Sequence, residues 1–156
     1  MARVVDRKAI GGAHVVIVDG GIHHVLRPAL VGQEHRVRGL GASNGGRVFP
    51  VTIAGPLCSG LDILAAQAVM PVPDVGDLVA VLDVGAYGYT ESMPLFLSHA
   101  TPPEIAIRDG VAALIRRRVE PAEWLQTQVI PDWAKDAGSG DAPGTGISRA
   151  GDRPAS

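Results

Sequence analysis

Short apolar, β-branched runs separated by turn residues give the chain the pattern of a β-rich protein. The run HVVIV, residues 14–18, leads into Asp-Gly-Gly, and the run RVFPVTIA, residues 47–54, follows Ser-Asn-Gly-Gly. Each pattern predicts a strand next to a turn, the first of them buried, and a positive φ is expected in the Asp-Gly-Gly turn. Pro50 indicates that the second strand lies at a sheet edge or contains a bulge. Further strands are predicted at residues 77–83 and 104–107.

Two other stretches have the spacing of helices. Within residues 60–69 the apolar positions recur at i, i+3, i+4 and i+7, and Ser59 before them is a suitable N-cap, so a helix is predicted there. These positions are Leu61, Leu64, Ala65 and Ala68. A second helix is predicted from Pro121 to about Gln128, whereas residues 111–118 fit a strand and a helix equally well.

The end of the chain differs in composition from the rest. Residues 136–156 are rich in Gly, Ser, Pro and Asp and have too few apolar side chains to offset the conformational entropy of the chain. We therefore expect a β-domain over residues 1–135 and a disordered tail over residues 136–156. The predicted elements favour a mainly β fold, a barrel or sandwich of antiparallel strands with short helices.

Composition and charge exclude several classes of function. The 156 residues suit one domain, and 14 Lys and Arg against 16 Asp and Glu give a net charge of -2, which does not favour nucleic acid or an anionic membrane. No run approaches the ~20 apolar residues of a membrane span, and the start of the chain has no apolar leader. The single cysteine, Cys58, excludes an internal disulfide. We expect a cytoplasmic protein.

The adjacent histidines His23 and His24 are a first candidate for chemistry. If they lie in a strand they point to opposite faces, and a metal would recruit only one of them with distant partners. The other histidines, His14, His35 and His99, show no ligand spacing. A structural role is therefore expected for them, and no metal site.

Tyr87 and Cys58 are the other two candidates. Tyr87 lies in GAYGY, where glycines allow close approach to a ligand and the phenol supplies a donor, although such tyrosines also occur in plain turns. Cys58 is either a small buried hydrophobe or, because the predicted helix follows it, a thiol whose pKa the helix dipole lowers. The residues alone leave both alternatives open.

Four segments, taken in order, resemble a known family. They are VDGGIHHVLRPAL, VTIAGPLCSGLDILA, VPDVGDLVAVLDVGAYGYTES and LIRRRVEPAEWL. Together they resemble the C-terminal β-domain of the fold type III pyridoxal-phosphate decarboxylases, which include the diaminopimelate, ornithine and arginine decarboxylases. The resemblance runs from about Val4 to Gln128 and implies a Greek-key-like β-domain. The (β/α)8 barrel of that family, with the Schiff-base lysine and the phosphate loop, is absent from this sequence, and neither Lys8 nor Lys135 lies in a family lysine motif.

The resemblance assigns roles to three residues. Cys58 matches the cysteine that reaches into the other protomer's barrel and returns a proton to the carbon that loses CO2. Tyr87 matches a tyrosine that approaches the cofactor and its phosphate. Arg27 matches an arginine that binds a substrate carboxylate in the diaminopimelate enzymes. A thiol that is neutral near pH 7 suits proton donation, and the guanidinium fork suits a carboxylate.

Two departures from the diaminopimelate enzymes change the expected substrate. Those enzymes have CESGD where this chain has CSGLD, so Ser59 replaces a substrate-reading glutamate, and Val31 replaces a tyrosine. Diaminopimelate, lysine and ornithine are therefore doubtful substrates, because partners for a distal ammonium group are missing. The GPLC segment followed by Leu-Asp is more similar to relatives that act on less usual amino acids or on carrier-bound aminoacyl groups.

Two functions follow from the resemblance. The first is a β-domain component of a split pyridoxal-phosphate-dependent decarboxylase, which pairs with a separate barrel polypeptide in a heterodimer or heterotetramer and is inactive alone. The start of the chain just before the first predicted strand agrees with such a domain boundary. The second is a non-catalytic remnant or a binding module that pairs with a barrel-containing decarboxylase. A metal-binding β-barrel that uses the histidines is a weaker third possibility.

Overall fold

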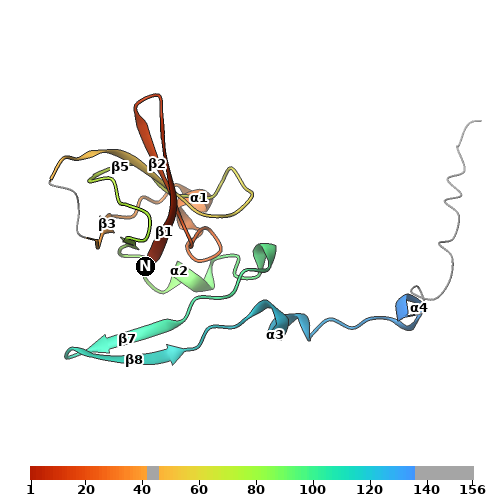
Figure 1. Cartoon of the computed structure of the whole chain (residues 1–156). Coiled ribbons are helices and arrows are strands. Elements are labelled where there is room, and N and C mark those ends of the chain that lie inside the picture. The colour runs from red at the N-terminus through yellow and green to blue at the C-terminus, as the bar shows by residue number, and fades with distance from the viewer. Residues whose placement is uncertain (42–45, 136–156) are drawn as a thin grey trace, which may run out of the picture.

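The computed structural model describes residues 1–41 and 46–135 as mainly β-structure (Figure 1). The strands in these residues are β1 (Ala2–Ile10), β2 (Ala13–Val18), β3 (Val37–Gly39), β4 (Phe49–Ala54), β5 (Ile63–Met70), β6 (Leu78–Val81), β7 (Glu104–Arg108) and β8 (Val111–Arg116). The helical segments are short: α1 (Arg27–Val31), α2 (Tyr87–Thr90), η1 (Phe96–Ser98), α3 (Pro121–Leu125) and α4 (Asp132–Lys135). The expected tail, residues 136–156, and the turn residues 43–45 lie outside the described residues.

The first six strands form one sheet in the order β3-β6-β1-β2-β4-β5. Its two outer strands, β3 and β5, also contact each other, so the sheet is a nearly closed barrel. Neighbouring strands are antiparallel except for β2 and β4, which are parallel. The core is formed by buried side chains from five strands: Val4, Val16, Val18, Val51, Ile53, Leu64, Met70 and Val79. The predicted mainly β fold is confirmed, with one parallel pair that the sequence did not predict.

Three strands of this sheet run in the same direction. β1 is antiparallel to both β2 and β6, and β2 is parallel to β4. The carboxyl ends of β2, β4 and β6 therefore lie together where these strands end, at what we call the site edge of the sheet. The loops that leave these ends, residues 19–26, 55–62 and 82–86, therefore start from that edge.

Most predicted strands are confirmed. Residues 14–18, 47–54, 77–83 and 104–107 correspond to β2, β4, β6 and β7, and the ambiguous stretch is strand β8. Pro50 is not at a sheet edge, because β4 lies between β2 and β5. The β2–β4 pairing begins one residue later, at Val51, and a register shift against β5 follows. The missing N–H of Pro50 therefore lies beyond that ladder.

The predicted helix at residues 60–69 is wrong, because residues 63–70 form strand β5. The register against β4 moves two residues, from Val51 to Ile53, while β5 moves three, from Ala68 to Ala65. Gln67 adopts a positive φ of 54° within this bulge. The extra residue breaks the period of two, so the apolar positions acquire a helix-like spacing. Ser59 is consequently no N-cap: its hydroxyl accepts the Leu61 N–H in a turn, at 3.2 Å.

The helix predicted at 121–128 is present but ends earlier, at Leu125. It begins with Pro121 after a capping box, in which the side chains of Glu120 and Glu123 accept each other's backbone N–H groups. Among the helices of residues 1–41 and 46–135, none has the length and apolar character needed to cross a membrane.

The hairpin β7–β8 is a separate two-stranded sheet, and Figure 1 shows it apart from the six-stranded sheet, with α3 beyond the end of β8. Its turn residues, Asp109 and Gly110, have the positive φ angles of a tight hairpin turn. Its large apolar side chains are exposed, and Ile107 and Val111 have 74% and 69% of their surface in solvent. A covering surface for this hairpin is missing from the described chain.

Candidate functional site

The three residues predicted to form the site follow the three co-directional strands. Arg27 begins α1 after β2, Cys58 lies in the loop between β4 and β5, and Tyr87 begins α2 after β6. Because the carboxyl ends of these strands share one edge of the sheet, the fold brings all three segments to that edge. Sequence separation alone, of about 30 residues between successive members, does not reveal this convergence.

Asp62 connects the Cys58 loop to the segment before Arg27. This carboxylate is buried, with 2% of the residue exposed. Its Oδ1 accepts the backbone N–H of Ile22 and its Oδ2 accepts that of Leu57, both at 2.7 Å. Each is a charge-assisted bond in a site shielded from water, the strong class of protein hydrogen bond. Asp62 therefore fixes the residue next to Cys58 against the β2–α1 loop.

Two glycines make room for this carboxylate. A Cβ on Gly21 would lie 2.3 Å from Asp62 Oδ1, and one on Gly55 would lie 2.2 Å from Oδ2. The positive φ expected in the Asp19–Gly21 turn is wrong, because neither Gly20 nor Gly21 has a positive φ. Gly21 is required for close approach, which the sequence of the turn alone could not distinguish. Asp62 itself was missed as a functional residue, although it is the acidic residue of CSGLD.

Cys58 is exposed and forms no disulfide. The first of the two alternatives for Cys58, a small buried hydrophobe, is therefore wrong. The alternative argument from a helix dipole is also wrong, because the element after the loop is strand β5 and not a helix. What the structure does provide is a solvent-accessible thiol on a loop that the Leu57–Asp62 hydrogen bond holds in place.

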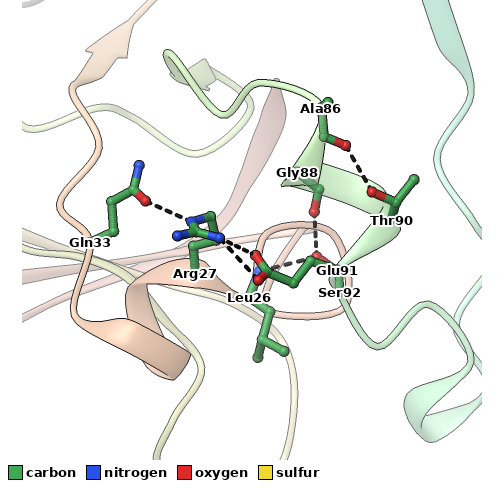
Figure 2. A network of polar contacts seen from close by, with 8 residues as sticks. All are labelled: Leu26, Arg27, Gln33, Ala86, Gly88, Thr90, Glu91 and Ser92. Carbon is green, nitrogen blue, oxygen red and sulfur yellow. Dashed lines mark hydrogen bonds and ion pairs between the residues drawn. The ribbon is translucent and has the colours of Figure 1, made fainter.

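Arg27 is the centre of a polar network between α1 and α2, which Figure 2 shows. Its Nη1 donates to both carboxylate oxygens of Glu91, at 3.0 and 2.8 Å, and its Nε donates to Gln33 Oε1 at 2.6 Å. The guanidinium carbon lies 5.4 Å from the centroid of the Tyr87 ring. A further bond, from the Leu26 N–H to the Ser92 hydroxyl at 3.1 Å, joins the same two helices. The network thus holds Arg27 and Tyr87 together.

A cleft of about 460 Å³ lies between α1 with the segment after it and β5. Its wall includes Gln33, the acceptor of the Arg27 Nε–H, and also Gly60 and Leu61 from the loop that carries Cys58. The rest of the wall comes from α1, from the segment that follows α1 and from β5. The cleft therefore connects the surroundings of Arg27 with the Cys58 loop.

The histidines form a packed group of a different kind. His23 and His24 lie in a turn, so the reasoning from opposite strand faces does not apply; their ring centroids are 3.8 Å apart, and His99 lies 4.9 Å from His23. Burial, followed by the neighbouring His23, lowers the pKa of His24 to about 4. Burial also lowers the pKa of His23. Within residues 1–41 and 46–135, no group of three or more His, Cys, Asp or Glu side chains is arranged to hold a metal ion.

Both lysines form exposed ion pairs, and Lys8 also lies away from the site edge. Lys8 pairs with Val15 near the start of β2, toward the opposite edge of the sheet, and its ammonium is 3.7 Å from Asp6. Lys135 is in α4 and pairs with Asp132 at 2.7 Å. Neither lysine is placed to hold a cofactor beside Tyr87.

Comparison with known proteins identifies the fold. Residues 1–85 match the family described as pyridoxal-dependent decarboxylase, C-terminal sheet domain. The chain is 40% identical over 136 residues to an L-glutamyl-[BtrI acyl-carrier protein] decarboxylase of Niallia circulans, which covers 83% of this chain and 32% of that protein. It is 37% identical over 140 residues to a diaminopimelate decarboxylase of Streptomyces coelicolor, with the same two shares.

Solved structures agree with these relatives. A crystal structure of diaminopimelate decarboxylase from M. jannaschii, in co-complex with L-lysine, superimposes with a TM-score of 0.78 at 26% identity and covers 85% of this chain and 30% of that one. The chain thus spans about a third of the length of the curated relatives it matches. It belongs to the family of pyridoxal-dependent decarboxylases and corresponds to their C-terminal sheet domain.

Proposed function

We propose that this chain is the β-domain component of a split pyridoxal-phosphate-dependent decarboxylase. In this proposal it completes the active site of a separate barrel polypeptide, in a heterodimer or heterotetramer. The observation that carries the proposal is the convergence of Arg27, Cys58 and Tyr87 at one edge of the sheet, two of them in direct contact. The exposed apolar hairpin β7–β8 supports a missing partner surface.

The residues of this chain fit one part of a pyridoxal-phosphate site. The side chain of Tyr87 is 63% exposed, so its phenol is free to donate a hydrogen bond to a phosphate group supplied from outside the chain. The lysine that holds the cofactor is expected on the partner, because Lys8 and Lys135 lie elsewhere. When bound, the cofactor supplies the electron sink that makes loss of CO2 from an amino acid possible.

Cys58 is the proposed proton donor. Its thiol, which carries a transferable proton, reaches solvent at the site edge. After CO2 leaves, a proton must be delivered to the carbon that has lost it, and the position of the donor decides which atom receives it. The Asp62 bond to Leu57 N–H supports this role, because it fixes the residue before Cys58.

The substrate is proposed to be an amino acid or an aminoacyl group attached to a carrier. Val31 is exposed in α1 and Ser59 lies in the Cys58 loop, so neither position offers a charged partner for a distal ammonium group. The relative from Niallia circulans is named for a glutamyl group on an acyl-carrier protein. Its similarity to this chain supports the carrier-bound class, and Arg27 is the proposed substrate contact.

The second candidate is a non-catalytic module that pairs with a barrel-containing decarboxylase. The absence of a cofactor lysine from the sequence favours it. The experiment that separates the two is co-expression of this chain with barrel polypeptides encoded beside it. Co-purification and CO2 release that requires both chains would support the split enzyme. A barrel chain that is fully active without this one would refute it.

A further inference from the structure

We propose that Glu91 makes the substrate pocket selective for an uncharged distal group, an ester, thioester or amide, and against a free distal carboxylate. The inference rests on the proposed function, since it treats Arg27 as a substrate contact. It goes further by naming the residue that determines which chemical class of substrate Arg27 accepts.

The geometry of the guanidinium is the first argument. A carboxylate binds an arginine bidentately through two N–H groups on one edge of the fork. The edge that contains Nε is occupied by Gln33, and the edge that contains Nη1 is occupied by Glu91. Nη2 makes no such bond to the residues that the structure describes. Only the Nη2 nitrogen is then left, so neither edge of the fork offers the free pair of nitrogens that a bidentate carboxylate uses, whereas a carbonyl oxygen needs one N–H.

Charge is the second argument. The Arg27–Glu91 pair is formally neutral, and its side chains are only 25% and 27% exposed, so solvent screens it incompletely. A carboxylate that approached Nη2 would also approach the carboxylate of Glu91, and the repulsion would cancel most of the attraction to Arg27. An uncharged carbonyl experiences no such repulsion.

The cleft beside the pair is the third argument. Among its lining residues the only carboxylate is Glu34, and no lysine or arginine lines it. Apart from Gln33, Glu34, His35 and Gln67, the wall consists of apolar residues and glycines. Such a cleft disfavours an anionic distal group but accommodates a neutral chain, such as the arm of a carrier-bound substrate.

The pairing of Arg27 and Glu91 is tested first in the full chain alone. The probe is glutarate, titrated against the Arg27 Nε–H resonance in the wild type and in Glu91→Gln. We expect no response in the wild type and a saturable shift in the variant. The matched control is Glu123→Gln, which frees Arg117 from a more exposed ion pair and should leave the Arg27 resonance unchanged. A wild-type response equal to that of Glu91→Gln would overturn the proposal.

Substrate class is tested in the complex with the barrel chain. The kcat/KM value is measured for glutamate and for its distal methyl ester. The readout is the ratio of these two kcat/KM values, because a folding defect lowers both together. The wild type should prefer the ester, and Glu91→Gln should move the ratio toward the acid by about ten- to a hundredfold, the effect of one regained charge-assisted bond. Turnover with an unchanged ratio overturns this inference alone. No turnover with any barrel chain overturns the proposed function and this inference with it.

Discussion

Replacement of Asp62 by Asn tests whether one buried carboxylate holds the site edge together. The substitution keeps the size of the side chain but replaces one acceptor oxygen by an NH2 group. That group then faces the backbone N–H of either Ile22 or Leu57, both of which now donate to Asp62 at 2.7 Å. One charge-assisted bond is lost and one buried N–H is left without an acceptor.

The expected cost can be estimated from these two bonds. A hydrogen bond to a charged group contributes about 1.5–3 kcal/mol net, and an unsatisfied buried donor costs about 1–3 kcal/mol. These contributions overlap, so the free energy of unfolding should fall by about 2–4 kcal/mol, out of the ~5–15 kcal/mol typical of a domain. With a slope of about 1–3 kcal/mol/M in urea, the unfolding midpoint should fall by at least about 0.7 M.

The assay is urea unfolding of the full chain, followed by far-ultraviolet circular dichroism. The matched control is Asp83→Asn, which removes the charge from an exposed pair in which Asp83 Oδ2 accepts two N–H groups of Arg36; the side chains are 64% and 78% exposed. This pair should contribute less than about 1 kcal/mol. A midpoint for Asp62→Asn within the error of the wild type, or equal to that of Asp83→Asn, would refute the assignment of Asp62 as the connection between the two loops.

Three further predictions follow from the same structure. Gly55→Ala should destabilise the chain by about 1–3 kcal/mol through overpacking, because the added Cβ would lie 2.2 Å from a buried carboxylate oxygen. The control Gly60→Ala should have little effect on the urea midpoint, because its Cβ would have no atom within 4 Å. The pKa of His24 is lowered to about 4 from an ordinary 6.5, so the unfolded chain takes up a proton first as the pH falls. The free energy of unfolding should therefore decrease between pH 6.5 and 4, by roughly 1–3 kcal/mol after allowance for partial exposure. His24→Gln should reduce this decrease between pH 6.5 and 5, and a pH dependence identical to that of the wild type would contradict the assignment. The chain alone, mixed with pyridoxal phosphate, should show no absorbance band of lysine-bound cofactor, and a band lost in Lys8→Ala or Lys135→Ala would contradict the proposed partner lysine.

The strands were predictable from the sequence where apolar residues form a short, uninterrupted run. β2 and β6 follow that rule, with buried Val16, Val18 and Val79 on the core side. β5 breaks it, because the bulge at Gln67 inserts a residue and leaves the apolar positions at helical spacing. Only the pairing with β4, which is a tertiary contact, decides between the two elements.

The site was predictable in part. The segments that carry Cys58, Tyr87 and Arg27 resemble the decarboxylase family, and the fold brings them to one edge because β2, β4 and β6 are co-directional. The parallel β2–β4 pair that creates this edge has no local sequence signal. Asp62 and Glu91 were missed for the same reason, since their partners lie 40 and 64 residues away along the chain.

The most direct test of the account is the Cys58→Ala variant in the complex of this chain with its barrel polypeptide. Its matched control is Ser59→Ala in the same loop. The account predicts that Cys58→Ala binds the barrel chain and the substrate normally but turns over ~10²–10⁴-fold more slowly, with some cofactor released in its amine form by misdirected protonation. Turnover at the wild-type rate with a clean product would contradict the role of Cys58 as the proton donor, and with it the claim that this chain completes a decarboxylase active site.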